Sequence, residues 1–224
     1  MSKTDTQQAA YRFPESLEAI HNRVLAMGGL VEQQLGGAIT ALLEGDAEIA
    51  RQVVEGDHAI DTLELALDEE CVHILARRQP AASDLRLVIA VLKTITDLER
   101  IGDEAERIGR MAVHLGGLAQ YPVLKAEVAS LGESVRRNLN GALNCFARLD
   151  VEQAVTVARQ DAAADRQYDA ILRQLTDQMM RDPASVPRMM DLMWVARSLE
   201  RIGDRSRNIC EYVIYLVRGK DVRH

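Results

Sequence analysis

The sequence predicts an all-α protein made of two tandem three-helix bundles. Long stretches place apolar residues at steps of three and four, which is typical of amphipathic helices. The order of helices and breaks in the first half recurs in the second, which indicates an internal repeat. Aromatic residues make up only 4% of the 224 residues, and a core of Leu, Ile, Val, Ala and Met favours packed helices over sheets. We therefore expect one repeat over residues 1–118 and a second over residues 119–224.

Six helices follow from the periodicity and from the residues that interrupt it. We expect them over about 15–43, 47–78, 85–115, 123–148, 151–181 and 188–218. The breaks contain residues that end or cap helices: Gly45 and Asp46, Gln79 to Ser83, Gly116, Gly117 and Pro122, Asp150, and Asp182, Pro183 and Pro187. Ser83 or Asp84 is expected to cap the third helix. Short connections of this kind make consecutive helices antiparallel.

Composition excludes several classes of function. The formal net charge of −7 argues against nucleic acid as a general partner, because binding to its backbone needs a basic surface. No run of about 18 apolar residues occurs, so we expect no direct membrane insertion. The N-terminal residues lack the apolar core of a secretory signal. The three cysteines, Cys71, Cys145 and Cys210, form no Cys-x-x-Cys pair, which indicates a reducing compartment and no disulfide framework.

A six-residue stretch, Leu-Glu-Arg-Ile-Gly-Asp, occurs twice, at residues 98–103 and 199–204. Each copy places a Glu and an Asp four residues apart, on one face of a helix. Pairs with the same spacing interrupt apolar stripes of the second and fifth expected helices. The four pairs are Asp57 with Asp61, Glu99 with Asp103, Asp161 with Asp165, and Glu200 with Asp204.

The pairs of each half are expected to meet at one level. In the first half, both acidic pairs lie about 20 residues from the turn that joins their two helices, which is roughly 30 Å at the rise of an α-helix. In the second half, the same counting places the two pairs level to within about one helical turn. Two like charges about 4 Å apart cost roughly 4 kcal/mol at an effective dielectric near 20. Such clusters must protonate, recruit arginines or bind cations, and oxygen ligands suit hard cations. Gly102 and Gly203 leave room beside each cluster for a cation or another helix.

Two other interpretations compete with a cation site. The acids can be a solvated face with ion pairs such as Asp103 with Arg107 and Glu106 with Arg110. A carboxylate-bridged metal enzyme of ferritin-like type needs Glu-x-x-His motifs, which occur as Glu18-x-x-His21 and Glu70-x-x-His73. However, His73 lies roughly 160° around its helix from Asp57, and nothing in the second half repeats His21. Trp194 and the methionines at 179, 180, 189, 190 and 193 are most simply interpreted as core, and the alternative is an exposed methionine cluster that serves a partner.

At this point the residues resemble those of a known family, the PhoU regulators of bacterial phosphate signalling. The likeness covers nearly the whole chain. It rests on both Leu-Glu-Arg-Ile-Gly-Asp copies and on the stretches 26–32, 68–72, 76–80, 83–86 and 205–211, and it reaches Asp221 and His224. The resemblance implies two three-helix bundles related by a pseudo-twofold axis. It also implies that the four acidic pairs are metal motifs, with iron, manganese, magnesium or zinc as candidate cations.

The resemblance further implies a cytoplasmic, usually homodimeric adaptor rather than an enzyme. Such an adaptor links the ATPase of a phosphate ABC transporter to a membrane sensor histidine kinase and represses the phosphate-starvation response. An Asn often follows the motif's Asp by four positions; Asn208 fits this pattern, but Arg107 stands there in the first repeat. Because a basic residue can replace a cation, the first site is the less certain metal site. The turn that carries Arg77, Arg78, Ser83, Asp84 and Arg86 is a candidate partner contact.

Overall fold

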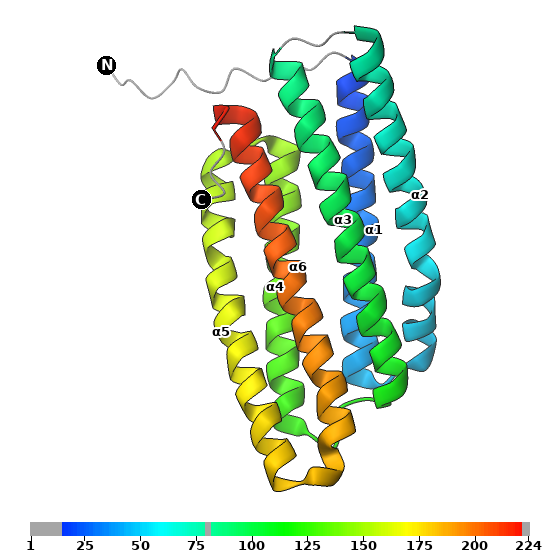
Figure 1. Cartoon of the computed structure of the whole chain (residues 1–224), viewed down its shortest axis with the longest axis vertical. Coiled ribbons are helices and arrows are strands. Elements are labelled where there is room, and N and C mark those ends of the chain that lie inside the picture. The colour runs from blue at the N-terminus through cyan, green and yellow to red at the C-terminus, as the bar shows by residue number, and fades with distance from the viewer. Residues whose placement is uncertain (1–14, 79–81, 221–224) are drawn as a thin grey trace, which may run out of the picture.

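The computed structural model describes residues 15–78 and 82–220, and these form six long α-helices (Figure 1). The helices are α1 (Glu15–Glu44), α2 (Ala47–Arg78), α3 (Ala82–Leu115), α4 (Pro122–Arg148), α5 (Val151–Arg181) and α6 (Val186–Arg218), with a 3-10 turn η1 (Pro183–Ser185) before α6. The all-α prediction is confirmed, and the expected helix ends agree within three residues. No helix among the described residues is long and apolar enough to cross a membrane.

Two helix starts differ from the sequence-based expectation. α3 begins at Ala82 instead of Leu85, so Asp84 lies within its first turn, where a carboxylate is favoured by the helix dipole, and neither Ser83 nor Asp84 precedes the helix as a cap. α6 begins at Val186 and includes Pro187, because proline lacks only an N–H that the first helical turn leaves unpaired in any case. Asp150 caps α5 as expected: its carboxylate accepts from the Gln153 amide at 3.0 Å.

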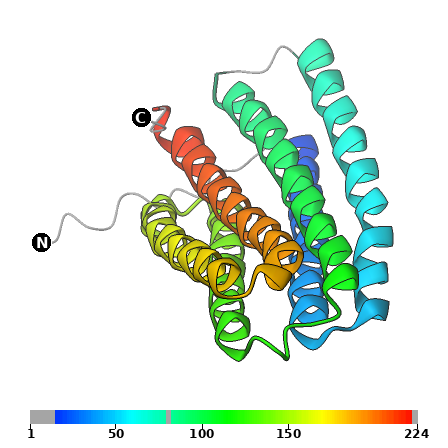
Figure 2. The same cartoon turned by 60° about the horizontal axis from the view of Figure 1, so that its bottom comes forward.

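The two bundles lie side by side and share a large interface. α2 and α5 form opposite edges of the molecule, and α1, α3, α4 and α6 lie between them (Figures 1 and 2). α3 packs against α1 and α2 within the first bundle and against α6 of the second, while α4 contacts α5, α6 and α1. The buried residues therefore form one continuous apolar core through both bundles.

The α3–α6 interface contains two buried carboxylates. Asp97 and Glu104, both on α3, are only 3% and 7% exposed. Asp97 accepts hydrogen bonds from Arg205 and Tyr212, each at 2.8 Å. Glu104 accepts hydrogen bonds from the Ser198 hydroxyl at 2.6 Å and from Arg201 at 2.8 Å, and both donors belong to α6. The residue numbers of the α6 partners decrease as those of α3 increase, so the two helices are antiparallel.

These contacts display the internal pseudo-twofold relation. Leu98 of the first repeat corresponds to Leu199, 101 residues later. By the same offset Asp97 corresponds to Ser198, and Glu104 corresponds to Arg205. The contact between Asp97 and Arg205 is therefore the symmetry counterpart of the contact between Ser198 and Glu104. The geometry is repeated, but the charges are not.

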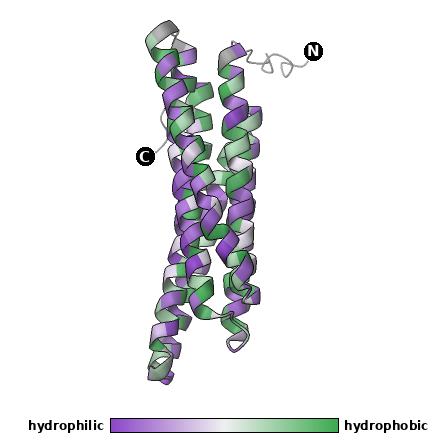
Figure 3. Ribbon diagram, turned by 90° about the vertical axis from the view of Figure 1, so that its right-hand side faces the viewer, coloured by the Kyte–Doolittle hydropathy of each residue, from purple (hydrophilic) through white to green (hydrophobic). Residues whose placement is uncertain are grey.

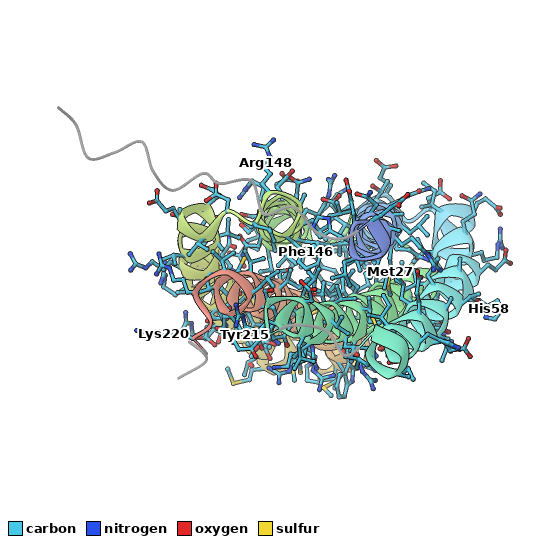
Figure 4. The ribbon with its side chains drawn as sticks, turned by 90° about the horizontal axis from the view of Figure 1, so that it is seen from above. Met27, His58, Phe146, Arg148, Tyr215 and Lys220 are labelled. Atoms are coloured by element: carbon cyan, nitrogen blue, oxygen red, sulfur yellow. The ribbon has the colours of Figure 1, made fainter. Side chains whose placement is uncertain are left out.

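The α1–α4 interface contains a close helix–helix approach at a glycine and a stacked pair of rings. A Cβ at Gly28 would lie 2.6 Å from Leu143, so the absence of a side chain lets the two helices approach closely. Nearby, the His21 ring stacks on Phe146 with centroids 4.9 Å apart, and its Nε2 lies 3.0 Å from the Phe146 carbonyl oxygen. Figure 4 shows Phe146 and Met27 directed into the interior, where both are fully buried.

The side chains assigned to the core divide into two groups. Met189 is buried, and Met179 and Met193 pack against the core. The expectation was wrong for Trp194, Met190 and Met180, which are 53%, 40% and 70% exposed. Figure 3, seen from the α2 side, shows hydrophobic and hydrophilic positions interspersed along the helices. Apolar periodicity alone does not distinguish the buried stripe of a helix from an apolar residue beside it.

Candidate functional site

The first acidic cluster lies between α2 and α3. It comprises Asp57 and Asp61 of α2 and Glu99 and Asp103 of α3, all of which are half-buried. Asp57 lies directly against the glycine of the first repeated motif, because a Cβ built at Gly102 would be 2.9 Å from its Oδ1. The two helices therefore bring these carboxylates to one level, as the residue counting predicted.

Burial and neighbouring carboxylates raise the pKa values of three acids in the first cluster. Burial raises the pKa of Asp57 to about 6, and repulsion from Asp61, Glu106, Asp103 and Glu99 adds to the effect. The pKa values of Glu99 and Asp103 are also raised, first by burial and then by neighbouring acids, although Arg100 opposes both shifts. These couplings join residues of two different helices, so the cluster is one electrostatic unit.

Glu106 belongs to this cluster but was not assigned to it from the sequence. It lies three residues beyond Asp103, which continues the face of α3 that carries the acids. Its carboxylate forms an ion pair with Arg110 at 2.5 Å, as expected, and still raises the pKa of Asp57. The signal that could have identified it is the three-residue step that extends the stripe.

The second acidic cluster lies between α5 and α6 and repeats the arrangement of the first. Asp161 is 3% exposed, and a Cβ at Gly203 would lie 2.8 Å from its Oδ1. Glu200 and Asp204 of α6 are half-buried beside it. Burial raises the pKa of Glu200, and repulsion from Asp204, Asp165 and Asp161 adds to the shift. Asp165 differs from expectation because its side chain is exposed rather than part of a buried face.

An arginine pairs with the most buried carboxylate of the second cluster, Asp161, whereas the arginines beside the first cluster pair with its other acids. Arg207 is 2.5 Å from Oδ2 of Asp161 and 3.0 Å from Oδ1 of Asp204. Burial raises the pKa of Asp161 to about 6 even though Arg207 opposes the shift. By the 101-residue offset, Arg207 corresponds to Glu106. The repeats thus carry opposite charges at equivalent places beside the acids.

The ion pairing beside the first cluster differs from the pairing expected from the sequence. Arg107 was expected to pair with Asp103 or to replace a metal there. Instead it pairs with Glu104 at 3.4 Å, because Glu104 lies at the α3–α6 interface one turn before it. Asp103 pairs with Arg100 at 3.4 Å. The first cluster therefore has no basic side chain on its most buried carboxylate, Asp57, whereas the second contains Arg207.

The donor chemistry fits a hard cation, although the side chains do not enclose one as they stand. Asp57 Oδ1, Asp161 Oδ1 and Glu200 Oε2 are buried without a hydrogen-bond partner among the described residues. Unpaired buried carboxylate oxygens are costly, and a divalent ion would satisfy them. Within residues 15–78 and 82–220, no three His, Cys, Asp or Glu side chains converge closely enough to ligate a single ion. Ligation would require changes in side-chain torsions while the helices stay in place.

The histidines of the ferritin-like alternative do not join the clusters. His21 is held in the α1–α4 interface against Phe146, and His73 is exposed on α2. His58 and His114 are exposed, as expected of surface residues. Cys71, Cys145 and Cys210 are free and buried. The structure therefore does not support a Glu-x-x-His metal enzyme.

The expected partner turn is described only on its α3 side. Gln79 to Ala81 and the side chains of Arg77 and Arg78 lie outside the described residues. Ser83 Oγ is 3.4 Å from Asp84 Oδ1, and both side chains are half-buried. The guanidinium carbon of Arg86 would lie 4.0 Å from a Cβ at Gly219, so this arginine packs near the C-terminal end of α6.

Comparison with known proteins identifies relatives along the whole chain. The family model described as the PhoU domain matches twice, at residues 24–112 and 128–213. A phosphate-specific transport system accessory protein PhoU homolog from Pseudomonas putida is 51% identical over 219 residues, which cover 98% of this chain and 86% of that protein. The crystal structure of PhoU from Pseudomonas aeruginosa superposes with a TM-score of 0.89 at 49% identity, covering 93% of this chain and all of that one. The phosphate transport system regulatory protein PhoU from Streptococcus pneumoniae gives 0.85 at 29% identity, covering 93% and 98%.

Proposed function

This chain belongs to the PhoU family, whose domain matches both of its repeats, and we propose that it is a non-catalytic regulatory adaptor of phosphate uptake and signalling. In this role it acts in the cytoplasm and contacts the ATPase of a phosphate ABC transporter. It also contacts a membrane sensor histidine kinase and represses the phosphate-starvation response when phosphate is plentiful. The observation that carries the proposal is kinship over nearly the whole chain with proteins named as accessory to phosphate-specific transport.

Several features of the molecule support an adaptor. Its helices, of 27 to 34 residues, are about 40 to 50 Å long at the rise of 1.5 Å per residue, and this length suits contacts with more than one protein. The family's association as a homodimer is part of the same proposal. The exposed apolar side chains Trp194 and Met190 lie on α6 rather than in the core, where they are available for contact with another protein.

Restoration of repression in a deletion strain tests the adaptor role. We expect the intact chain to repress a phosphatase reporter in phosphate-rich medium and to retain both the transporter ATPase and the kinase in pull-downs. Asp84→Lys, in the first turn of α3, should weaken retention of at least one of them, whereas Glu44→Lys, exposed at the end of α1, should not. The adaptor role would be refuted if variants lost repression while every one of them kept both partners.

We also propose that the acidic clusters hold divalent cations. The ligands would be Asp57, Asp61, Glu99 and Asp103 in the first cluster, with the corresponding acids Asp161, Asp165, Glu200 and Asp204 in the second. The unpaired oxygens of Asp57 and Asp161 support this assignment. A bound cation would offset the repulsion within each cluster and so stabilise the position of the edge helix, α2 or α5, against its neighbour.

The unequal charges beside the clusters lead to a prediction for metal content. Glu99→Ala with Asp103→Ala should remove most of the metal bound by the first cluster. Glu200→Ala with Asp204→Ala should remove less, because Arg207 already neutralises part of the second cluster. Elemental analysis of protein purified without chelator measures the difference, with the exposed acids Glu18 and Glu44 replaced by alanine as a control. Unchanged metal in both double variants would exclude these ligands.

A further inference from the structure

The outer faces of the two edge helices carry opposite charges at corresponding positions. On α5, Arg159, Arg166 and Arg173 are exposed and follow one another at seven-residue intervals. Residues seven apart on a helix lie on the same face, two turns from one another. Asp57 of α2 corresponds to Asp161 of α5, 104 residues later. By this offset, the three arginines correspond to Glu55, Thr62 and Glu69 of α2, which are also exposed.

These charges are free for contacts with another molecule. Among residues 15–78 and 82–220, no ion pair or side-chain hydrogen bond involves Glu55, Glu69 or any of the three α5 arginines. Asp169 lies between Arg166 and Arg173 on α5 but is paired with neither. Most other exposed arginines of the middle helices do have such partners, including Arg100 and Arg197. The three arginines therefore have no ion-pair partner within the part of the chain that the structure describes.

The α2 stripe also exposes apolar side chains. Leu65 and Val72, again seven residues apart, are 64% and 54% exposed. Leu65 lies between Glu55 and Glu69 along α2, and Val72 lies just beyond Glu69. Both are on the same side of α2 as His58, which Figure 4 shows projecting away from the molecule. The positively charged face of α5 exposes the small residue Ala163 between Arg159 and Arg166. A leucine can pack over such a gap in a row of long side chains.

We infer that this chain associates edge to edge, with the α2 face of one copy against the α5 face of the next. α2 and α5 are antiparallel and lie at opposite edges (Figures 1 and 2), so two copies in the same orientation bring these helices together as an antiparallel pair. The equal spacing then places Glu55 opposite Arg173 and Glu69 opposite Arg159, with Thr62 facing Arg166 and Leu65 facing Ala163.

Charge complementarity selects this partner over a symmetric dimer of either face. Two α2 faces would oppose glutamates, and two α5 faces would oppose arginines, and like charges directly opposite disfavour association. The pairing is therefore heterologous, and because successive copies have the same orientation, with no rotation to close a ring, it builds open rows. A closed dimer of this chain must use a different surface. This inference does not depend on the proposed adaptor role.

Sedimentation or light scattering of the intact chain at several concentrations tests the inference. At about 0.05 M NaCl we expect the weight-average mass to rise continuously with concentration, and at about 0.5 M NaCl the rise should disappear because exposed charges are screened. Glu55→Lys with Glu69→Lys should abolish the rise, as should Arg159→Glu with Arg173→Glu. Mixing the two double variants should restore association, since each supplies the face that the other needs.

A matched control separates the faces from net charge. Glu18→Lys with Glu44→Lys makes the same change in charge on α1 and should leave the rise intact, and circular dichroism checks that every variant is folded. A wild-type mass that does not vary with salt or concentration overturns the inference. So does a fixed dimer that is unaffected by the α2 and α5 substitutions, or a mixture of folded double variants that does not associate.

Discussion

Replacing Arg205 with alanine is expected to lower the free energy of unfolding by about 3–5 kcal/mol, the range for removing one partner of a buried ion pair. Its guanidinium is 2.8 Å from Oδ1 of Asp97, which is 3% exposed. Without Arg205, the carboxylate keeps the hydrogen bond from Tyr212 but loses its counter-charge. Urea unfolding at neutral pH, followed by circular dichroism, measures the loss.

Replacing the acid of this pair, Asp97, with alanine should lower the free energy of unfolding by less, about 1–3 kcal/mol. Asp97→Ala leaves a guanidinium that can turn to water, because the Arg205 side chain is 39% exposed. Arg201→Ala is the matched control, since Glu104 retains Ser198 and Arg107 after Arg201 is removed. Equal losses for Arg205→Ala and Asp97→Ala would show that the buried carboxylate is not the costly group.

The same pair also determines which helices associate. Glu104 stands in α3 where Arg205 stands in α6, 101 residues later. If the first repeats of two chains paired through α3, Asp97 of one would face Glu104 of the other in a buried interface. Pairing α3 with α6 of the same chain instead matches each acid with a donor. The charge difference between the repeats therefore disfavours the pairing of first repeats from two chains through α3.

The fold and the level of the acidic clusters could be predicted because both depend on repeated local signals. Helix lengths follow from apolar periodicity and from breakers such as Gly45 and Pro122. Once α2 and α3 are antiparallel with a short turn, residue counting alone brings Asp57 beside Gly102. The rise per residue is constant, so an error of three residues at the start of α3 changes only the distance to the turn.

The ion pairing could not be predicted because it depends on what lies across an interface. Arg107 can reach Asp103 or Glu104 along its own helix, and only the packing of α3 against α6 makes Glu104 the partner. Arg207 turns to Asp161 because α5 presents that carboxylate from the next helix. Trp194 illustrates the same limit, since its large apolar side chain lies just outside the stripe that packs on the core.

Asp57→Asn is expected to stabilise the metal-free protein at pH 7.5 by about 1–2 kcal/mol. The pKa of Asp57 is raised to about 6 in the folded chain, above the ordinary value near 3.9 of an unfolded aspartate. The folded state therefore binds a proton more tightly than the unfolded state. The charged form of Asp57 therefore lowers the free energy of unfolding. This loss is absent below pH ~4, grows between pH ~4 and ~6, and reaches its full size above pH ~6. A full shift of two units corresponds to about 2.7 kcal/mol, which we reduce because Asp57 is only half-buried.

The pH profile separates this effect from a general benefit of asparagine. Unfolding by urea in the presence of a chelator should show a clear gain for Asp57→Asn at pH 7.5 and little at pH 4.5, and the wild type should itself be more stable near pH 5 than at pH 7.5. A gain of the same size at both pH values would contradict the assignment, because it could not arise from the carboxylate charge.

Asp161→Asn provides the matched comparison from the second repeat. The pKa of Asp161 is also raised to about 6 by burial, but its carboxylate pairs with Arg207 at 2.5 Å. Asparagine at position 161 removes both the cost of burying the charge and the attraction to Arg207. We therefore expect a smaller gain in the free energy of unfolding than at Asp57, or a loss. A charged group kept where its neutral isostere is more stable indicates a role other than folding. The role that we propose for Asp57 is the binding of a cation, so divalent metal should stabilise the wild type at pH 7.5 and leave Asp57→Asn almost unchanged.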